Sequence, residues 1–222
     1  MDRRTRPERI SEVLKDLDAD IIALQEVIGP GPGGPGHAEG FGAALGMGWV
    51  MAPARELRRH HFGNVVLSRL PIRDHTQHDL SWKSSEPRNS QRVEIELGPG
   101  CVQIFNVHLG TALLERRYQA SRLATWVHER RPSGPKIVLG DFNEWLRSGP
   151  ATNILEERLK SMDLTPYLPK RRSYPGIFPL VHLDHIYHLG AVEIRRAELI
   201  RTRKAKIASD HLPLIADIRV TF

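Results

Sequence analysis

The chain has 222 residues, of which 40% are hydrophobic and 26% charged, and its net charge is +6. This length and apolar content suit a sizeable core, so we expect a single domain over residues 1–222. No apolar run is long enough to span a membrane, and the charged N-terminus lacks the apolar segment of a signal peptide. The single cysteine excludes an intramolecular disulfide. These features favour a cytoplasmic protein.

The basic charge attracts anions, including phosphates and nucleic acids. The 32 Lys and Arg residues are scattered along the chain rather than gathered in one tract. The charge therefore does not identify a partner by itself.

The first elements predicted along the chain are a helix and a strand. Residues 8–18 have the apolar spacing of an amphipathic helix. Its apolar face comprises Ile10, Val13, Leu14 and Leu17. Residues 20–27 resemble a short buried strand. The Gly- and Pro-rich segment 29–36 cannot form regular structure. Because apolar segments resume on both sides of it, we interpret it as a surface loop inside the domain.

Strands predominate in the rest of the chain. They are expected at 48–52, 62–69, 92–97, 101–109, 136–141, 183–188, 192–200 and 212–220. Helices are expected at 112–130 and at 152–160. The apolar positions expected to face inward on the longer helix include Leu114, Tyr118, Leu123 and Val127. Because strands often follow one another without a helix between them, we expect an α+β fold with two mainly antiparallel sheets packed together and helices outside.

Five of the predicted strands end in, or run into, polar residues that can bind a metal or move protons. These residues are Glu26, Asn106, His108, Asp141, Asn143, Asp184, His185, Asp210 and His211. Each alone is more simply a solvated, packed or turn residue. Their recurrence beside buried apolar runs favours a functional site, because an unpaired buried charge is costly.

This set of side chains suits phosphoryl chemistry. Mg²⁺ prefers carboxylate oxygens, so Glu26 is a candidate ligand, and zinc fits less well because the carboxylate and amide content favours a harder ion. Asp141 can accept a proton from water, and Asn143 can hold that water or a phosphate oxygen. A histidine beside an aspartate can stay protonated and donate to a phosphoryl oxygen. Ser-His-Asp hydrolysis fits poorly, because Ser209 lacks the strand-turn-helix glycine frame.

Six motifs, in order, resemble those of the endonuclease/exonuclease/phosphatase superfamily of metal-dependent phosphoesterases. They are ALQEV (23–27), GNVVLSRLPI (63–72), NVHLG (106–110), LGDFNEW (139–145), LDHIY (183–187) and SDHLPL (209–214). Two of them, GDFN and SDHLP, are moderately specific, and the ordered set is strongly specific. The resemblance implies a four-layer α/β/β/α sandwich of two mixed, mainly antiparallel sheets. It also implies hydrolysis of phosphate mono- or diesters by in-line attack of water, with Mg²⁺, or Mn²⁺ in its place.

The resemblance further implies a role for each matching residue. Glu26 matches the main metal carboxylate, and Asp210 matches the second acid on the metal side. Asp141 matches the acid that orients or deprotonates the attacking water. Asn143 and His108 match residues that contact the phosphate. Asp184 matches the acid that pairs with a histidine, and His211 matches the catalytic histidine. Residues that match substrate-binding positions are Asn64, Arg88 and Asn106.

The N-terminus departs from the family pattern. Members normally open with a strand that ends in an Asn and helps to hold the metal, whereas here a helix begins within ten residues of Met1. This departure supports the alternative of a catalytically impaired relative that binds phosphate or nucleic acid. It also predicts weaker metal binding. A second expectation is that the vacant strand edge is filled, either by residues of a longer reading frame, by a swapped segment or by a partner chain. DNA, RNA, a phospholipid headgroup and small phosphate esters all remain candidate substrates.

Overall fold

The computed structural model describes residues 6–129, 134–146, 148–161, 168 and 171–222. The helices are α1 (Pro7–Leu17), α2 (His37–Leu45), α3 (Leu113–Glu129), α4 (Pro150–Arg158) and α5 (Arg203–Ala208). The strands are β1 (Ile21–Ile28), β2 (Gly48–Leu57), β3 (His60–Ser68), β4 (Ile72–Asp79), β5 (Asn89–Leu97), β6 (Gly100–His108), β7 (Lys136–Asp141), β8 (Lys160–Ser161), β9 (Asp184–Leu189), β10 (Val192–Leu199) and β11 (Leu214–Val220).

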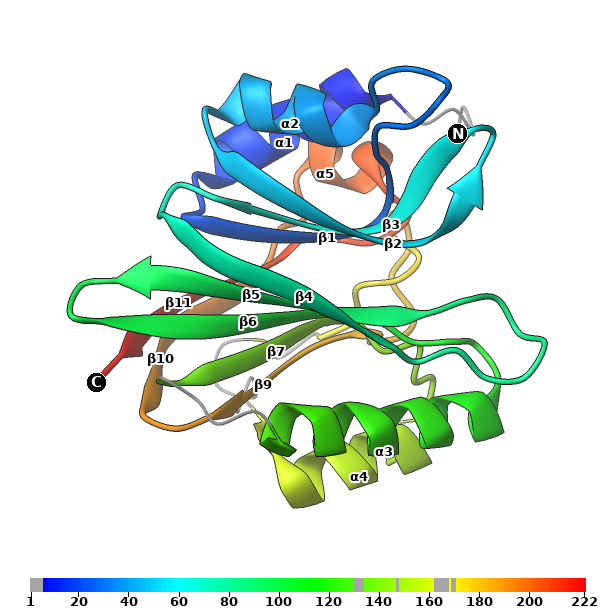
Figure 1. Cartoon of the computed structure of the whole chain (residues 1–222), viewed down its shortest axis with the longest axis vertical. Coiled ribbons are helices and arrows are strands. Elements are labelled where there is room, and N and C mark those ends of the chain that lie inside the picture. The colour runs from blue at the N-terminus through cyan, green and yellow to red at the C-terminus, as the bar shows by residue number, and fades with distance from the viewer. Residues whose placement is uncertain (1–5, 130–133, 147, 162–167, 169–170) are drawn as a thin grey trace.

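These elements stack in four layers. Figure 1 shows α1, α2 and α5 above a sheet of order β1-β3-β2, and α3 and α4 below a six-stranded sheet of order β4-β5-β6-β7-β9-β8. The β6–β7 pair is parallel, and the β4–β5, β5–β6, β7–β9 and β8–β9 pairs are antiparallel. The predicted α+β sandwich of two mixed, mainly antiparallel sheets is confirmed.

The smaller sheet layer is divided into two hydrogen-bonded pieces. In the described part of the chain, β1 pairs only with β3, and β11 pairs only with β10. Both pieces face the large sheet, because Ile218 of β11 shares an apolar cluster with Val66 of β3 and Ile137 of β7. No described segment pairs with the second edge of β1 or of β11. That a partner chain covers these two strand edges stays a prediction.

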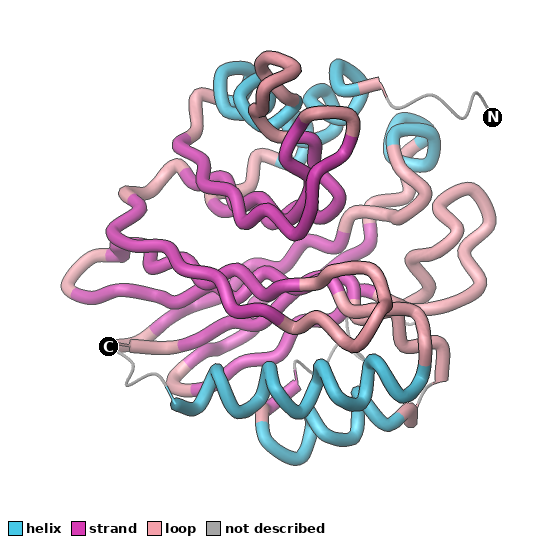
Figure 2. The backbone as a smooth tube through the Cα atoms, turned by 45° about the vertical axis from the view of Figure 1, so that its right-hand side comes forward, coloured by secondary structure: helices cyan, strands magenta, loops and turns pink. Residues whose placement is uncertain are grey.

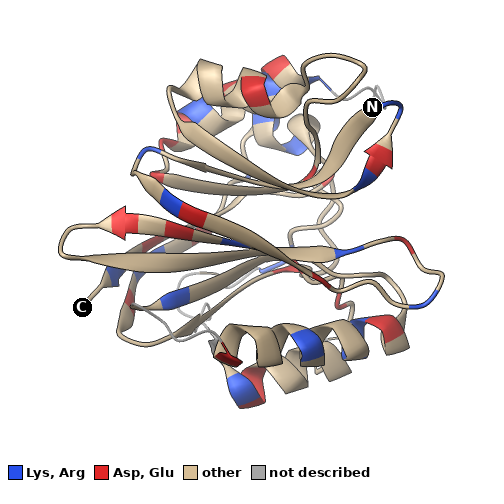
Figure 3. Cartoon of the chain, in the orientation of Figure 1, with Lys and Arg blue, Asp and Glu red and all other residues tan. Residues whose placement is uncertain are grey.

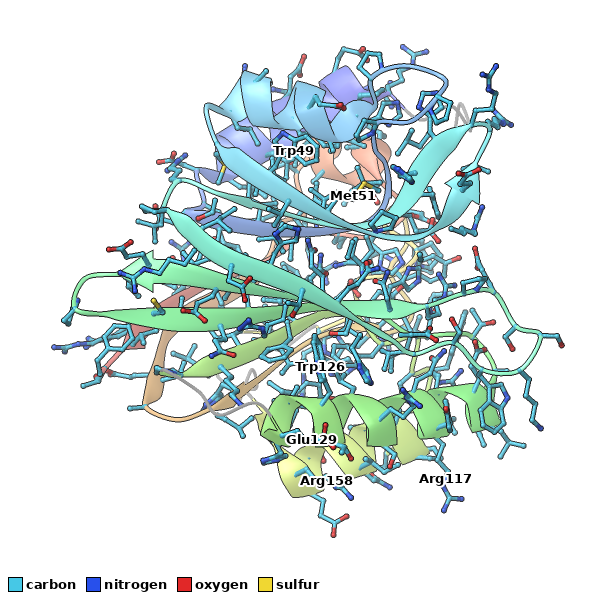
Figure 4. All side chains as sticks on the ribbon, in the orientation of Figure 1. Trp49, Met51, Arg117, Trp126, Glu129 and Arg158 are labelled. Atoms are coloured by element: carbon cyan, nitrogen blue, oxygen red, sulfur yellow. The ribbon has the colours of Figure 1, made fainter. Side chains whose placement is uncertain are left out.

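Apolar side chains fill all three interfaces between the layers. Trp126 of α3 packs on the large sheet, with its ring edge-on to Phe105 at 5.1 Å between centroids. Figure 4 shows Trp126 between α3 and that sheet, and Trp49 and Met51 under α1 and α2. These interfaces hold the strands rigidly, so the residues at their ends have fixed positions.

The structure corrects the expected inward face of the long helix. Leu114 is 64% exposed, whereas Leu123 and Val127 are buried as predicted. The buried stripe of α3 begins one residue later, at Glu115. The expectation was wrong because the inward face at the start of this helix is polar.

The charges are mixed over all four layers, as their scatter in the sequence indicated. Figure 3 shows Lys and Arg interspersed with Asp and Glu on helices and strands of both halves. No helix among the described residues has both the length and the apolar character needed to cross a bilayer.

Candidate active site

Strand register brings three of the predicted site residues side by side. His108 of β6 lies opposite Asp141 of β7, and Asp141 lies opposite Asp184 of β9. All three therefore lie at the same end of the central strands β6, β7 and β9. Figure 2 shows that long loops gather at this end of the two sheets, which is where functional residues are commonly found.

Gly140 explains why the buried strand β7 gives way to polar residues at this point. Its φ of +139° is a conformation that side-chain-bearing residues rarely adopt. A Cβ atom there would lie 2.0 Å from the carbonyl oxygen of Val107. Glycine thus allows β7 to approach β6 closely, and this places Asp141 beside His108.

Asp141 lies between two histidines. Its Oδ2 is 3.5 Å from Nε2 of His108 and 3.7 Å from Nε2 of His211. The other nitrogen of His211, Nδ1, lies 2.9 Å from Oδ2 of Asp184. The other oxygen of Asp141 accepts a hydrogen bond of 2.8 Å from the backbone N–H of Asn143. The carboxylate is therefore held in place, with one oxygen directed at the two imidazoles.

The two histidines differ in charge at neutral pH, because their pKa values are shifted in opposite directions. Burial, with the charges of Arg88 and His211, lowers the pKa of His108 to about 3. Burial lowers the pKa of His211 as well, but the hydrogen bond and charge of Asp184, with the charges of Asp141 and Asp210, outweigh it and raise the pKa to about 9. At neutral pH, His108 is therefore neutral and His211 is protonated.

The pKa of the Asp141 carboxyl is raised toward neutral pH. Burial and the charge of Asp184 raise its pKa to about 7, against the opposing effect of the positive His211. A carboxylate with a pKa near the ambient pH is suited to accept and release a proton.

Arg88 fixes the tautomer of His108. Its Nη1 lies 3.2 Å from Nδ1 of His108. Because a guanidinium can only donate, Nδ1 must accept, and the single ring proton of His108 lies on Nε2, facing Asp141. The Nε atom of Arg88 is buried and has no hydrogen-bond partner in the described part of the chain.

A small pocket adjoins this cluster on the side of β1. It is lined in part by Glu26, Asn64, Arg88 and His108, with Glu86 at its edge. Glu86 forms ion pairs with Arg88 at 3.0 Å and with Arg55 at 2.7 Å. Among the described residues, by contrast, none forms a hydrogen bond or ion pair with the carboxylate of Glu26, so this side chain is available to bind a cation.

Two site residues, Glu26 and Asn143, have positive φ angles, which are uncommon for residues other than glycine. Glu26 has a φ of +58° inside β1, at a bulge where the register with β3 shifts. Asn143 has a φ of +50° directly after β7, and its Nδ2 donates to the carbonyl of Leu109 at 2.8 Å. Bulges and left-handed residues often redirect side chains at functional sites. Here Glu26 lines the pocket beside His108, and the backbone N–H of Asn143 holds Asp141.

Comparisons with known proteins agree with this geometry. The model of the Endonuclease/Exonuclease/phosphatase family matches residues 1–211. The chain belongs to this family. It is 28% identical over 229 residues to the uncharacterized protein YbhP of Escherichia coli (strain K12), covering 98% of this chain and 90% of that protein.

Solved structures of the family share the fold at low sequence identity. A mannosyl-6-phosphatase of Bacteroides thetaiotaomicron VPI-5482 superposes with a TM-score of 0.79 at 17% identity, covering 98% of this chain and 91% of that one. A humanized D. rerio TDP2 gives a TM-score of 0.77 at 16% identity, covering 97% and 91%. Family members are phosphatases and nucleases and generally depend on a divalent metal.

Glu26 is a candidate ligand for the divalent metal on which family members generally depend. Within the described residues, no group of three or more His, Cys, Asp or Glu side chains is arranged to hold a metal ion. Glu26 nevertheless fits Mg²⁺, which usually takes one or two carboxylates and keeps several waters. Asp210 does not line the pocket of Glu26. It lies next to His211, where its side chain accepts from Ser209 at 3.4 Å.

Asn64 and Asn106 are more deeply buried than the sequence suggested. The amide of Asn106 is fully buried and joins the two sheets through its Nδ2, which donates to the carbonyls of Leu24 and Val65. Asn64 donates to Asn89 but also lines the pocket. Asn64 therefore remains a candidate substrate contact, whereas the contacts of Asn106 are structural.

Several supporting residues had no recognisable signal in the sequence. The hydroxyl of Ser173 donates to Oδ2 of Asp184, and the ring of Tyr174 packs on His211 at 5.0 Å between centroids. Glu144 forms a buried ion pair with Arg116 at 3.2 Å, which anchors the loop that carries Asn143. Of these, only Glu144, inside LGDFNEW, belonged to a motif.

His185 supports the site from the opposite face of β9. Its ring packs edge-on against Phe142 and stacks on Tyr187, and its Nε2 is buried without a hydrogen-bond partner in the described part of the chain. Burial and the nearby His182 lower the pKa of His185 to about 3. The folded protein therefore holds this ring neutral, whereas an unfolded chain protonates it near pH 6.5.

This difference predicts an acid-sensitive fold. Because the folded pKa is depressed, the stability contribution of His185 is complete above about pH 6.5 and is lost as the pH falls toward 3. We expect the melting temperature to fall between pH 7 and pH 5, and to fall less in His185→Phe, which keeps the ring shape. The exposed His75→Phe serves as the control. An equally steep fall in His185→Phe would show that this ring does not contribute.

Proposed function

We propose that this protein hydrolyses phosphate esters by in-line attack of an activated water, with a divalent cation, Mg²⁺ or Mn²⁺, bound at Glu26. The observation that carries the proposal is the geometry at Asp141, whose Oδ2 lies 3.5 Å from one imidazole nitrogen and 3.7 Å from another. A carboxylate between two ring nitrogens can take a proton from water while donors on both sides contact the phosphate.

Each residue of the cluster has a role in this proposal. Asp141 orients the water and accepts its proton. His211, held by Asp184, donates to a phosphoryl oxygen, and His108 directs its Nε2 proton to the same region. The second Nδ2 hydrogen of Asn143 is available to a phosphate oxygen, because the first is bonded to Leu109.

The pocket residues complete the proposed site. Arg88 and Asn64 contact the ester on the side of Glu26. A divalent cation held there supplies Lewis-acid stabilisation of the phosphoryl charge when it is bound. A role for Asp210 as a further acid on the metal side stays a prediction, because this residue does not line the pocket of Glu26.

The test is turnover of bis-p-nitrophenyl phosphate and of p-nitrophenyl phosphate in buffer with Mg²⁺. We expect the native chain to release nitrophenol from at least one of them, and His211→Ala to lose this activity, because a donor at the phosphate is removed. Equal release by the native chain and His211→Ala would contradict the proposal.

The alternative function is that of an impaired relative that binds phosphate or nucleic acid without hydrolysing it. Among the described residues, no strand pairs with the second edge of β1 or of β11. This observation favours the alternative, because the family pattern places a strand there. In that case, phosphate raises the melting temperature while neither ester is turned over. Binding to an oligonucleotide that weakens steeply with salt would identify nucleic acid as the ligand.

A further inference from the structure

Exposed apolar side chains gather beside the candidate active site. Among the described residues, nine large hydrophobic side chains are exposed. Five of them lie on the loops that follow β7 and precede β9, and two more lie in the first turn of α3, which follows β6. These strands carry His108, Asp141 and Asp184. Five of the seven form what we call the apolar rim, namely Trp145, Leu146, Ile177, Phe178 and Leu180.

Ring contacts connect the apolar rim to the proposed catalytic histidine. The ring of Trp145 lies edge-on to Tyr174 at 6.0 Å between centroids, and Tyr174 packs on His211 at 5.0 Å. Trp145 is 53% exposed and Phe178 is 72% exposed. The rim therefore starts two rings away from His211 and is exposed, as are Leu113 and Leu114 in the first turn of α3.

Basic side chains stand at the base of the rim. Arg172 precedes the loop that carries Ile177 and Phe178 and is exposed. Arg201, which is also exposed, donates to the carbonyl of Arg172 at 3.1 Å. Protruding Trp, Phe and Leu side chains with Arg behind them are typical of proteins that lie on membranes, because the rings enter the acyl boundary while the cations meet anionic headgroups.

We propose that the apolar rim docks this protein on bilayers that contain anionic phospholipid, and that the substrate is a phosphate ester held in such a bilayer. This inference rests on the proposed phosphoesterase function for the substrate, but the docking itself requires no turnover. The rim lies on the loops next to Asp141 and Asp184 and connects to His211 through Tyr174, so a bilayer docked on it would bring headgroup phosphates close to these residues while the apolar part of the lipid stays in the membrane.

The test is cosedimentation with vesicles in EDTA, so that binding is measured without hydrolysis. Vesicles of phosphatidylcholine alone are compared with vesicles that contain an equal part of phosphatidylglycerol. We expect binding to the mixed vesicles, and a partition coefficient lowered by about tenfold or more in Phe178→Ser, since burying a large apolar side chain contributes about that factor. Arg172→Gln is expected to weaken the preference for the anionic vesicles.

The matched control is Ile207→Ser, which removes an exposed apolar side chain on α5, in the helix layer of the smaller sheet. It should bind vesicles like the native chain. Because Phe178 and Ile207 are both exposed, neither change disturbs the core, and equal melting temperatures confirm this. Failure of the native chain to bind, equal loss in both variants, or self-association that Phe178→Ser abolishes would each overturn the proposal. Vesicle binding without any ester hydrolysis would contradict the proposed function but leave the docking surface standing.

Discussion

Replacing Asp141 with Asn is expected to slow phosphate-ester hydrolysis by roughly 10²–10⁴-fold, the usual effect of removing a general base. The amide keeps the shape of the side chain, and its oxygen can still accept the hydrogen bond from the backbone N–H of Asn143. The fold should therefore survive, with a melting temperature close to that of the native chain. Steady-state turnover of a chromogenic ester measures the effect.

A matched control exists at the end of β4. Asp79 accepts a hydrogen bond of 2.9 Å from the backbone N–H of Ser81, in the same arrangement that joins Asp141 to Asn143. If Asp141 acted only as a turn residue, Asp79→Asn and Asp141→Asn would have similar, small effects. Near-native turnover in Asp141→Asn would therefore refute its catalytic role.

Removal of divalent metal is expected to abolish turnover, and addition of Mg²⁺ or Mn²⁺ should restore it. The physical reason is that Glu26 lies in the pocket beside Arg88 and His108 and has no ion-pair partner among the described residues. Binding to the folded chain alone should also raise the melting temperature. Titration of Mg²⁺ by both turnover and thermal unfolding measures the requirement, and full activity in EDTA would contradict it.

The pocket provides its own control for the metal ligand. Glu26→Gln should require much more Mg²⁺ for turnover and should lose the Mg²⁺-dependent rise in melting temperature. Glu86→Gln changes a second pocket glutamate that is already paired with Arg55 and Arg88. It should keep that rise. A similar loss in both variants would indicate a general effect of pocket charge rather than a ligand role for Glu26.

Much of the fold could be predicted because its strands have strong apolar patterns. The elements that were missed have weak local signals. α2 contains two glycines, and its position depends on packing of Ala38 and Phe41. β4 is polar along most of its length and is held by pairing with β5. Such elements depend on tertiary contacts, which a local pattern does not contain.

The candidate site was predictable in its residues but less so in its geometry. Motifs pointed to His108, Asp141 and His211, which the structure brings together. The sequence could not show that Asn106 lies fully buried between the sheets, because its motif neighbour His108 faces the site. It also gave no sign of Tyr174 or Ser173, because contacts between distant loops have no local spacing rule.

The left-handed conformation of Glu26 has a consequence for engineering this protein. A non-glycine residue in this region of φ and ψ costs of order 1–3 kcal/mol, and Glu26 has this conformation inside a strand rather than at a turn or helix cap. Glycine at this position would relieve the strain and remove the carboxylate in one step. Selection of variants for thermal resistance alone would thus favour a chain that has lost its proposed metal ligand, so heat tolerance and activity compete at a single residue.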